Sequence, residues 1–227
     1  MIIALTGQKG GIGKSTTAIC LAVAALERGS RVLLVDADPQ GTVRTWCDVA
    51  NEAARKAPTV VAMGATMHRA GQLRDMAASF DVVVIDCPPR HGDIQRSALM
   101  VADLAVLPCG PSAADAWALA GSLDVLAEAR SLREDLAACV LLTRKQGRTV
   151  LAKGARAALS AAGLPILRTE LGHRVAYQEA LAAGHGITTY APRDAGARET
   201  YQLLEELEKL VHGEESSPCF VAQAAAC

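Results

Sequence analysis

The chain has 227 residues, of which 51% are hydrophobic and only 3% aromatic, so it is long enough for one well-buried domain with an aliphatic core. The formal net charge of −1 gives no global reason to expect a nucleic-acid partner, so such a partner must be inferred from a local patch. No apolar stretch is long enough to span a bilayer, the first residues lack a secretory pattern, and the seven cysteines form no CxxC pair. We therefore expect a soluble cytoplasmic protein with reduced, buried thiols and no membrane partner.

Short apolar runs alternate with longer amphipathic stretches along the chain. The apolar runs predict strands at residues 2–6, 31–36, 59–63, 81–86, 104–108, 136–143 and 165–167. The amphipathic stretches predict helices at about 14–28, 42–56, 68–79, 93–102, 113–133, 149–162, 174–183 and 195–212. This alternation predicts an α/β fold with a mostly parallel, twisted sheet covered by helices on both faces. We expect a single domain over residues 1–212 and a flexible tail over 213–227.

The first predicted strand is followed by a glycine-rich loop that leads into a helix. Free backbone N–H groups and the positive end of a helix dipole make this arrangement suitable for phosphate, although such a loop can also be a turn with no ligand. Lys14 is expected to reach the β- and γ-phosphates of ATP, and the Ser15 hydroxyl to bind Mg²⁺. The expected nucleotide-binding residues of this loop are Gly10, Gly11, Ile12, Gly13, Lys14, Ser15 and Thr16.

The loop departs from the usual P-loop pattern at its start, where Gln8 stands in place of glycine and a second lysine, Lys9, follows. A lysine at the mouth of the loop cannot easily curl back onto the phosphates of its own subunit. It is free to reach a nucleotide held by another subunit and to neutralise transition-state charge there, as arginine fingers do. The alternative is an ordinary solvated loop lysine.

Carboxylates follow two further apolar strands, and the carboxyl ends of parallel strands line one crevice. Asp86 comes after four consecutive apolar β-branched residues, as a Walker B aspartate does, and is expected to hold Mg²⁺. Asp38 is expected to orient or deprotonate the attacking water, and Asp36 to support the metal shell. Each of these acids alone could instead cap the helix that follows its strand.

Residues 9–16, 36–40 and 86–89 together resemble the ParA/MinD family of deviant-Walker ATPases, and the likeness extends over about residues 1–211. The resemblance implies an ATP-driven sandwich dimer in which Lys14 binds phosphate in cis and Lys9 acts in trans. It also implies that hydrolysis depends on Asp38. The adenine is implied to lie near Thr143, Arg144 and Pro192.

Composition distinguishes branches of that family. Iron-protein and arsenical-pump relatives use paired metal-binding cysteines, and the surroundings of Cys87 and Cys109 lack that pattern. MinD-like members end in a basic amphipathic membrane helix, whereas the last predicted helix here is acidic. Because the first predicted strand begins at residue 2, we expect no extra N-terminal DNA-binding domain of the kind that longer partition ATPases have. The chain therefore resembles a short ParA, as found in compact plasmid partition systems and orphan positioning systems.

Basic residues gather in the segment from residue 144 to residue 174, where seven of them accompany a single acid, Glu170, for a local charge of 7 − 1 = +6. This segregation predicts non-specific DNA binding through phosphate contacts, with an ATP-dependent dimer doubling the patch. The alternative is a basic face that is merely solvated. Arg168 belongs to the patch, and the expected DNA-binding residues are Arg144, Lys145, Arg148, Lys153, Arg156 and Arg174.

Three functions remain open at this point. The favoured one is a nucleoid-associated, Mg²⁺-dependent ATPase that positions or segregates a plasmid, chromosome or other cargo. In this reading a ParB-like or other adaptor stimulates slow hydrolysis in an ATP-dependent homodimer. The alternatives are a biosynthetic ligase or kinase that uses the same loop, and a nucleotide-switched regulator with little turnover.

Overall fold

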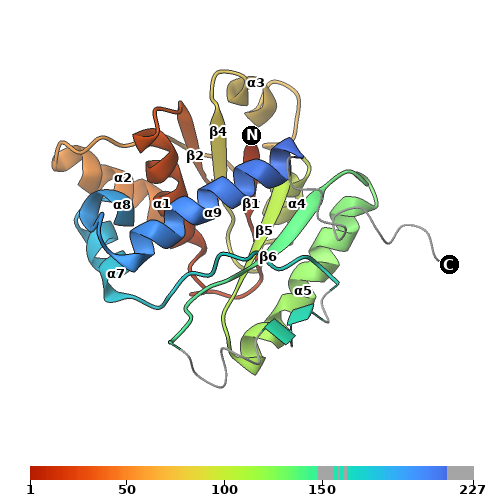
Figure 1. Cartoon of the computed structure of the whole chain (residues 1–227). Helices are drawn as coiled ribbons and strands as arrows, with labels where there is room; N and C mark the ends of the chain where they lie inside the picture. Colours follow the sequence, from red (N-terminus) through yellow and green to blue (C-terminus); the bar gives the residue numbers. More distant parts are fainter. Residues whose placement is uncertain (148–155, 158, 161–162, 214–227) are drawn as a thin grey trace.

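The computed structural model describes residues 1–147, 156–157, 159–160 and 163–213 (Figure 1). At its centre lies a parallel sheet of six strands in the order β3-β2-β4-β1-β5-β6. The strands are β1 (Ile2–Leu5), β2 (Val32–Asp36), β3 (Thr59–Ala62), β4 (Val82–Asp86), β5 (Leu104–Cys109) and β6 (Ala137–Leu142). The predicted α/β class with a parallel sheet is therefore confirmed.

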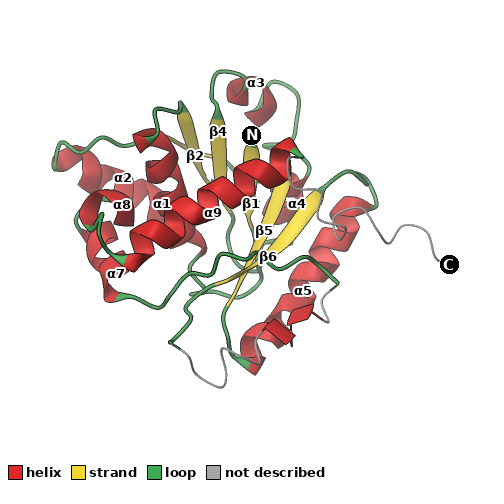
Figure 2. Ribbon diagram, viewed as in Figure 1, coloured by secondary structure: helices red, strands yellow, loops and turns green. Residues whose placement is uncertain are grey.

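Helices cover both faces of this sheet (Figure 2). The helices are α1 (Lys14–Glu27), α2 (Thr42–Glu52), α3 (Leu73–Ala77), α4 (Gly92–Leu99), α5 (Ala113–Arg130), α7 (Val175–Ala182), α8 (Ile187–Tyr190) and α9 (Ala195–His212). Apolar residues of α1, α2 and α9 pack on one face, and those of α3, α4 and α5 pack on the other. Among the described residues, none of the helices is both long enough and apolar enough to cross a bilayer.

The strand sequences explain this two-sided core. In β1, Ile3 and Leu5 face the α1 side while Ala4 faces the α5 side, because successive side chains of a strand point to opposite faces. The residues of β4 alternate in the same way, and all five are buried. A strand buried on both faces reads as a continuous apolar run, which is why the sequence pattern located these strands well.

Three expectations differ from the structure. Residues 165–167 do not form a strand: Ile166 makes one isolated bridge with Val140 of β6, through hydrogen bonds from Val140 N to the carbonyl oxygen of Pro165 and from Leu167 N to that of Val140. The helix expected at 68–79 is limited to α3, and α8 was missed because four residues are too short to show a periodic pattern.

Of the helix expected at 149–162, residues 156, 157, 159 and 160 are described and are helical. The expected tail lies outside the described residues except for Gly213, whose left-handed φ of 71° ends α9.

The register of the sheet brings the ends of its central strands together. Leu5 of β1 pairs with Asp86 of β4, and Asp86 pairs in turn with Asp36 of β2. The loops that follow these strands therefore start side by side at one edge of the sheet. In open parallel sheets, this edge is where ligands bind.

Candidate functional site

The loop between β1 and α1 has the geometry of an anion cradle. Gly11 and Gly13 have φ values of 70° and 93°, which residues with a Cβ rarely adopt. A Cβ added at either glycine would meet no other atom within 4 Å, so the loop backbone borders open space. Gly13 stands immediately before α1 and has no side chain to cap the helix, which leaves backbone N–H groups available to a ligand.

A cavity of about 460 Å³ opens beside this loop. A volume of this size is typical of small-molecule sites. Lys14, Ser15, Thr16 and Thr17 line it together with Gly10, Gly11 and Gly13. The other lining residues are Asp38, Gln40, Thr42, Pro89, Thr143, Arg144, Leu171, Gly172, His173, Arg174, Tyr177 and Gln178.

Lys14 is held inside the loop. Lys14 is only 6% exposed, and its Nζ donates a hydrogen bond to the carbonyl oxygen of Lys9 at 2.9 Å. Burial lowers the pKa of Lys14, whereas the nearby charge of Asp86 opposes that shift. A partly desolvated ammonium at the wall of the cavity is well placed to meet a phosphate.

Asp86 is buried at the end of β4, and neither of its carboxylate oxygens accepts a hydrogen bond from a described residue. Burial raises its pKa to about 7; the Ser15 hydroxyl and the Lys14 charge, both close to the carboxylate, act in the opposite direction, and the charge of Asp36 adds to the increase. Such an unsatisfied carboxylate is costly unless a cation shares its site. Asp86 and Ser15 therefore fit Mg²⁺, which would take its remaining ligands from phosphate and water, since no cluster of three ligating His, Cys, Asp or Glu exists in the described parts of the chain.

Asp36 has different surroundings from Asp86, although the two residues are paired in the sheet. Its Oδ2 accepts hydrogen bonds from the backbone N of Arg44 at 3.0 Å and from Arg44 Nε at 3.3 Å, and its Oδ1 accepts one from the backbone N of Asp38 at 3.2 Å. These contacts hold the first turn of α2 against the end of β2. In this structure Asp36 therefore caps the start of α2, which was the alternative to metal binding. Its assignment to the metal stays a prediction.

Asp38 lies at the wall of the cavity, half-buried, two residues beyond β2. Its Oδ1 accepts a hydrogen bond from the backbone N of Gln40 at 2.9 Å, which fixes the carboxylate in the loop that enters α2. This position on the cavity wall is compatible with the predicted role in orienting water, and that role stays a prediction.

The structure corrects one expectation about Lys9, because its ammonium is not free at the mouth of the loop. Lys9 Nζ lies 2.6 Å from Oδ1 of Asp115, in the first turn of α5, and the Lys9 side chain is 36% exposed. Lys9 is not one of the described residues that line the cavity. The reason is that α5 packs beside the loop, where the Ser122 hydroxyl accepts a hydrogen bond from the backbone N of Gln8 at 3.0 Å.

Sequence reasoning missed two polar residues that support the loop. Gln95 of α4 is buried; its amide nitrogen donates to the carbonyl oxygen of Pro88 at 2.6 Å, and its Oε1 accepts from Gln8 at 3.1 Å. A glutamine within an apolar helical face was the available signal. The other residue is Asp115, whose spacing from Ser112 matches a capping box and so predicts a helix start. Nothing in that spacing indicates that Lys9 is its partner.

Of the three residues expected near the adenine, two line the cavity and the third does not. Thr143 and Arg144 line the cavity and bind the loop: Thr143 Oγ1 donates to the carbonyl oxygen of Ile12 at 2.8 Å, and Arg144 Nη1 donates to that of Gly11 at 2.9 Å. Pro192 is exposed and is not among the described residues of the lining. Its part in adenine binding therefore stays a prediction without a contact to support it.

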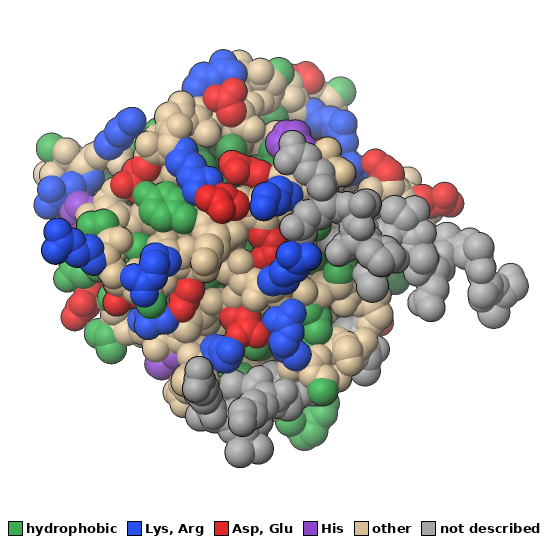
Figure 3. All heavy atoms as spheres, in the orientation of Figure 1, with side chains coloured by type: hydrophobic (Ala, Val, Ile, Leu, Met, Phe, Trp, Pro, Cys, Tyr) green, Lys and Arg blue, Asp and Glu red, His purple; other side chains and the backbone are tan. Residues whose placement is uncertain are grey.

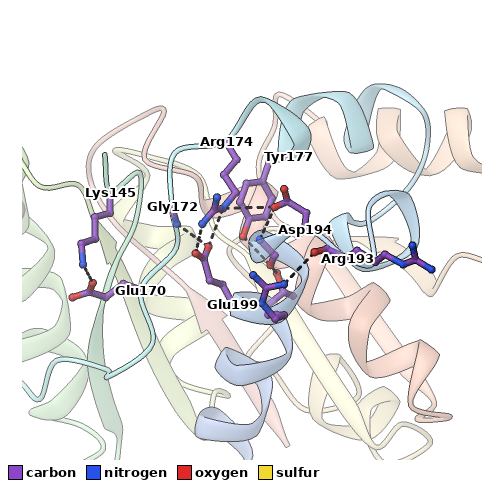
Figure 4. A network of polar contacts seen from close by, with 11 residues as sticks. Lys145, Glu170, Gly172, Arg174, Tyr177, Arg193, Asp194 and Glu199 are labelled. Carbon is purple, nitrogen blue, oxygen red and sulfur yellow. Dashed lines mark hydrogen bonds and ion pairs between the residues drawn. The ribbon is translucent and has the colours of Figure 1, made fainter. Parts of the chain in front are cut away.

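The segment from Leu171 to Gln178, which motif analysis did not assign to the site, forms the wall beside Thr143. Figure 4 shows how α9 holds it: Arg174 pairs with Glu199, and Glu199 Oε2 also accepts a hydrogen bond from the backbone N of Gly172 at 3.0 Å. The Tyr177 hydroxyl donates to the carbonyl oxygen of Gly196 at 3.2 Å. This wall depends on contacts with α9 that span 19 to 27 residues of the chain, so no local motif indicates it.

In the folded chain, acidic residues offset part of the positive charge of the basic segment, residues 144–174. Lys145 and Arg156 both pair with Glu170, and Arg174 pairs with Glu199. Glu206 of α9 also accepts a hydrogen bond from the backbone N of Arg168 at 2.7 Å, and Figure 3 shows basic side chains interspersed with acidic ones on the face drawn. Arg148 and Lys153 lie outside the described residues. The DNA-binding assignment remains a prediction, and acids of α9 that the local charge count omitted offset part of the patch.

The fold and the site define an α/β P-loop protein with a phosphate cradle, an adjacent cavity and a buried carboxylate suited to a divalent cation. The chain belongs to the CobQ/CobB/MinD/ParA nucleotide binding domain family, whose model matches residues 3–187. The expected family is therefore confirmed.

Two relatives resemble the chain over nearly its whole length. The maintenance of carboxysome distribution protein A of Halothiobacillus neapolitanus is 30% identical, with 90% of this chain and 95% of that protein covered. The chromosome-partitioning ATPase Soj of Thermus thermophilus is 34% identical, with 90% of this chain and 94% of that protein covered.

Solved structures agree with this placement. The cell division ATPase MinD of Pyrococcus furiosus matches with a TM-score of 0.72 and 25% identity, covering 92% of this chain and 98% of that chain. Cobyrinic acid a,c-diamide synthase of Mycobacterium smegmatis, solved with bound ADP and magnesium, matches with a TM-score of 0.75 and 21% identity, covering 97% of this chain and 99% of that chain. At that identity the likeness to the synthase shows the fold alone.

Proposed function

We propose that this protein is a Mg²⁺-dependent, ParA-type ATPase that forms a sandwich dimer on ATP binding and positions or segregates a cargo. The observation that carries the proposal is the loop with two lysines, Lys14 in the cavity wall and Lys9 beside it, next to the buried and unsatisfied Asp86. The similarity to a chromosome-partitioning ATPase and to a carboxysome-distribution protein supports positioning as the use of that site.

Within one subunit the phosphates of ATP lie in the cradle of Gly10, Gly11 and Gly13, where Lys14 neutralises the β- and γ-phosphates. The Ser15 hydroxyl and the Asp86 carboxylate would hold the metal, which when bound would supply positive charge to offset that of the transferred phosphoryl group. Asp38 accepts a hydrogen bond from the attacking water and orients it towards the γ-phosphate. Thr143, Arg144 and the segment from Leu171 to Gln178 enclose the rest of the nucleotide.

Lys9 completes the site of a second subunit. When two nucleotide-bound subunits meet at their loops, the Lys9 ammonium of each contacts the phosphates of the other and stabilises the charge that develops during hydrolysis. This requirement links hydrolysis to dimerisation. An adaptor protein, ParB-like in a partition system, then stimulates slow turnover and returns the dimer to monomers.

The dimer binds DNA without sequence preference and is therefore associated with the nucleoid in the cytoplasm. The basic segment supplies phosphate contacts, and dimerisation doubles them, so DNA retention depends on ATP. The support for this part is the local charge of residues 144–174 together with the partitioning relative.

The central test is the dependence of turnover on two subunits. ATP hydrolysis and sedimentation are measured over a range of protein concentrations with ATP and Mg²⁺, for the natural chain and for Lys9→Ala. We expect specific activity to rise with dimer formation in the natural chain, and Lys9→Ala to bind ATP but to lose dimerisation or turnover. Normal hydrolysis by Lys9→Ala would show that the trans role is wrong.

A biosynthetic ligase or kinase is the second candidate, because a diamide synthase shares the fold. Such an enzyme would hydrolyse ATP only together with an acceptor molecule and would not need Lys9 from a second subunit. Turnover that rises with DNA and an adaptor, without an acceptor, speaks against it. ATP binding with little turnover under all these conditions would instead favour a nucleotide-switched regulator.

A further inference from the structure

The buried side chain of Gln95, in α4, lies between the phosphate loop and the loop that follows Asp86. Gln95 is fully buried. Its Nε2 donates hydrogen bonds to the carbonyl oxygen of Pro88 at 2.6 Å and to that of Gly7 at 3.4 Å. Pro88 stands two residues after Asp86, and Gly7 stands at the start of the phosphate loop. One side chain from a third element therefore joins the two loops that carry the candidate metal and phosphate sites.

The register of the sheet explains why a side chain is needed at this point. Leu5 of β1 and Asp86 of β4 are the last paired residues of these two strands. Gly7 and Pro88 each lie two residues beyond that pair, where the strands no longer form a ladder. Because the Gln95 amide bonds one carbonyl oxygen from each segment, it continues the connection between β1 and β4 past the end of the sheet.

The orientation of this amide gives a role to Gln8. Carbonyl oxygens can only accept hydrogen bonds, so Nε2 of Gln95 must face them and its Oε1 must face the other way. On that side Gln8 Nε2 donates to Oε1 of Gln95 at 3.1 Å, and the Gln8 backbone N is bound to the Ser122 hydroxyl at 3.0 Å. Gln8 stands where the usual P-loop pattern has glycine, and glycine has no side chain that could donate this hydrogen bond.

We propose that Gln95 is a positioning residue that sets the place of Asp86 relative to the phosphate loop, and that Gln8 is the partner that fixes Gln95. This inference rests on the proposed Mg²⁺–ATP site. In that site the metal would be shared between Asp86 on one loop and Ser15 and the phosphates on the other, so its binding depends on the distance between the loops. Phosphates bound without metal contact the cradle alone and do not depend on that distance.

The test measures how much Mg²⁺ tightens ATP binding to the full-length chain. Gln95→Met keeps the length of the side chain but removes both donors and the acceptor. The readout is the ratio of the dissociation constants of a fluorescent ATP analogue in chelator and in Mg²⁺. We expect this ratio to fall by about tenfold, as is usual when a residue that orients a metal ligand is lost. The dissociation constant in chelator should stay nearly unchanged.

A second measurement needs neither nucleotide nor metal. In the free chain, Gln95→Met should make amide hydrogen exchange several-fold faster in residues 7–13 and 87–91, because the two loops are no longer joined. Exchange in β5 and β6 should stay as in the natural chain.

Two further variants separate positioning from stability. Gln8→Ala removes only the bond to Oε1 of Gln95 and should lower the ratio less. Added to Gln95→Met, it should have no further effect, because both substitutions break one chain of contacts. Ser97→Ala removes another buried polar side chain of α4, whose hydroxyl accepts a hydrogen bond from the backbone N of His68 at 3.2 Å. It should lower the melting temperature and leave the ratio unchanged.

The outcomes distinguish this inference from the proposed function. A ratio that falls in Gln95→Met and Gln8→Ala, but not in Ser97→Ala, supports it. An unchanged ratio in Gln95→Met, or equal losses of affinity with and without Mg²⁺, overturns the positioning role; if Gln95→Met does not fold, an unchanged ratio in Gln8→Ala does the same. Additive effects in the double variant would disprove the pairing with Gln8. If Mg²⁺ does not tighten ATP binding in the natural chain, the proposed metal site fails, and hydrogen exchange still tests whether Gln95 joins the loops.

Discussion

Two lysines five residues apart have opposite surroundings at the residue scale. Lys14 is buried at the cavity wall, where its ammonium is bound by a backbone carbonyl oxygen, whereas the half-exposed Lys9 is bound by a carboxylate of another element. A phosphate entering the cavity can replace the weaker partner of Lys14 without moving the chain. Lys9 is already paired with a carboxylate, so its proposed contact with the phosphates of a second subunit has to compete with an ion pair.

Lys14→Ala is expected to weaken ATP binding by roughly 100-fold, because it removes a charged hydrogen-bond donor from a partly desolvated site. Titration with a fluorescent ATP analogue measures the effect. Lys56→Ala, which removes an exposed lysine elsewhere, serves as the matched control. Unaltered affinity in Lys14→Ala would mean that the nucleotide does not occupy this cavity.

The buried carboxyl of Asp86 predicts a pH-dependent stability in the absence of nucleotide and Mg²⁺. Its pKa in the folded chain is about 7, above the usual value of 3.8, so its stabilising contribution is complete below about pH 4 and is lost as the pH rises through 7. We expect Asp86→Asn to melt at a higher temperature than the natural chain at pH 8 and at a similar temperature at pH 4. Melting followed by circular dichroism measures both, and an equal difference at the two pH values would contradict the assignment.

At the scale of elements, the start of α2 shows how a residue expected at the metal serves a helix. Asp36 accepts hydrogen bonds from the backbone N of Arg44 and Asp38, so β2 and α2 are joined through one carboxylate. A side chain with both oxygens engaged is a poor metal ligand unless those bonds are exchanged. On the neighbouring strand, neither carboxylate oxygen of Asp86 accepts a hydrogen bond from a described residue.

Asp36→Ala should therefore destabilise the chain even without Mg²⁺, by about 1–3 kcal/mol, because it leaves the backbone N–H of Arg44, in the first turn of α2, and that of Asp38, in the preceding loop, without their acceptor. Urea unfolding in the presence of a chelator measures this loss. Asp48→Ala, which removes an exposed acid further along α2, should have little effect. If Asp36→Ala destabilised the chain only when Mg²⁺ and ATP were present, the metal assignment would be correct instead.

At the scale of the whole molecule, α9 closes one face of the sheet and also brings acids to the basic segment. Glu199 and Glu206 contact residues 168–174 from the far end of the chain, so the electrostatic surface depends on tertiary packing. The DNA prediction has to account for this partial neutralisation. We therefore expect moderate affinity that becomes useful only when a dimer doubles the contacts.

Retention on random duplex DNA should require ATP and should fall steeply with salt, because each phosphate contact releases counterions. Arg156→Glu with Lys153→Glu should abolish retention at about 0.15 M salt while ATP binding persists. Arg31→Glu with Arg96→Glu makes the same change of charge elsewhere on the fold and should keep most of the binding. Equal retention with and without ATP would contradict the prediction.

Much of the fold and part of the site were predictable from sequence. The strands β1, β2, β4, β5 and β6 are buried on both faces, so each appears as an uninterrupted apolar run, and the phosphate loop lies within nine consecutive residues. The short α8 and the single bridge of Ile166 were not predictable, because neither is long enough to produce a periodic pattern.

The sequence by itself determined the nucleotide-binding class, the phosphate loop with its second lysine, and the candidate acids, because each is encoded in a contiguous stretch with its own spacing. Only the tertiary structure decided which partners these residues meet. Lys9 is bound by Asp115 from α5, Asp36 is engaged by α2, and the cavity wall at residues 171–178 is held by α9. These contacts join side chains from separate elements, and the packing of helices on the sheet, not local spacing, sets their distances.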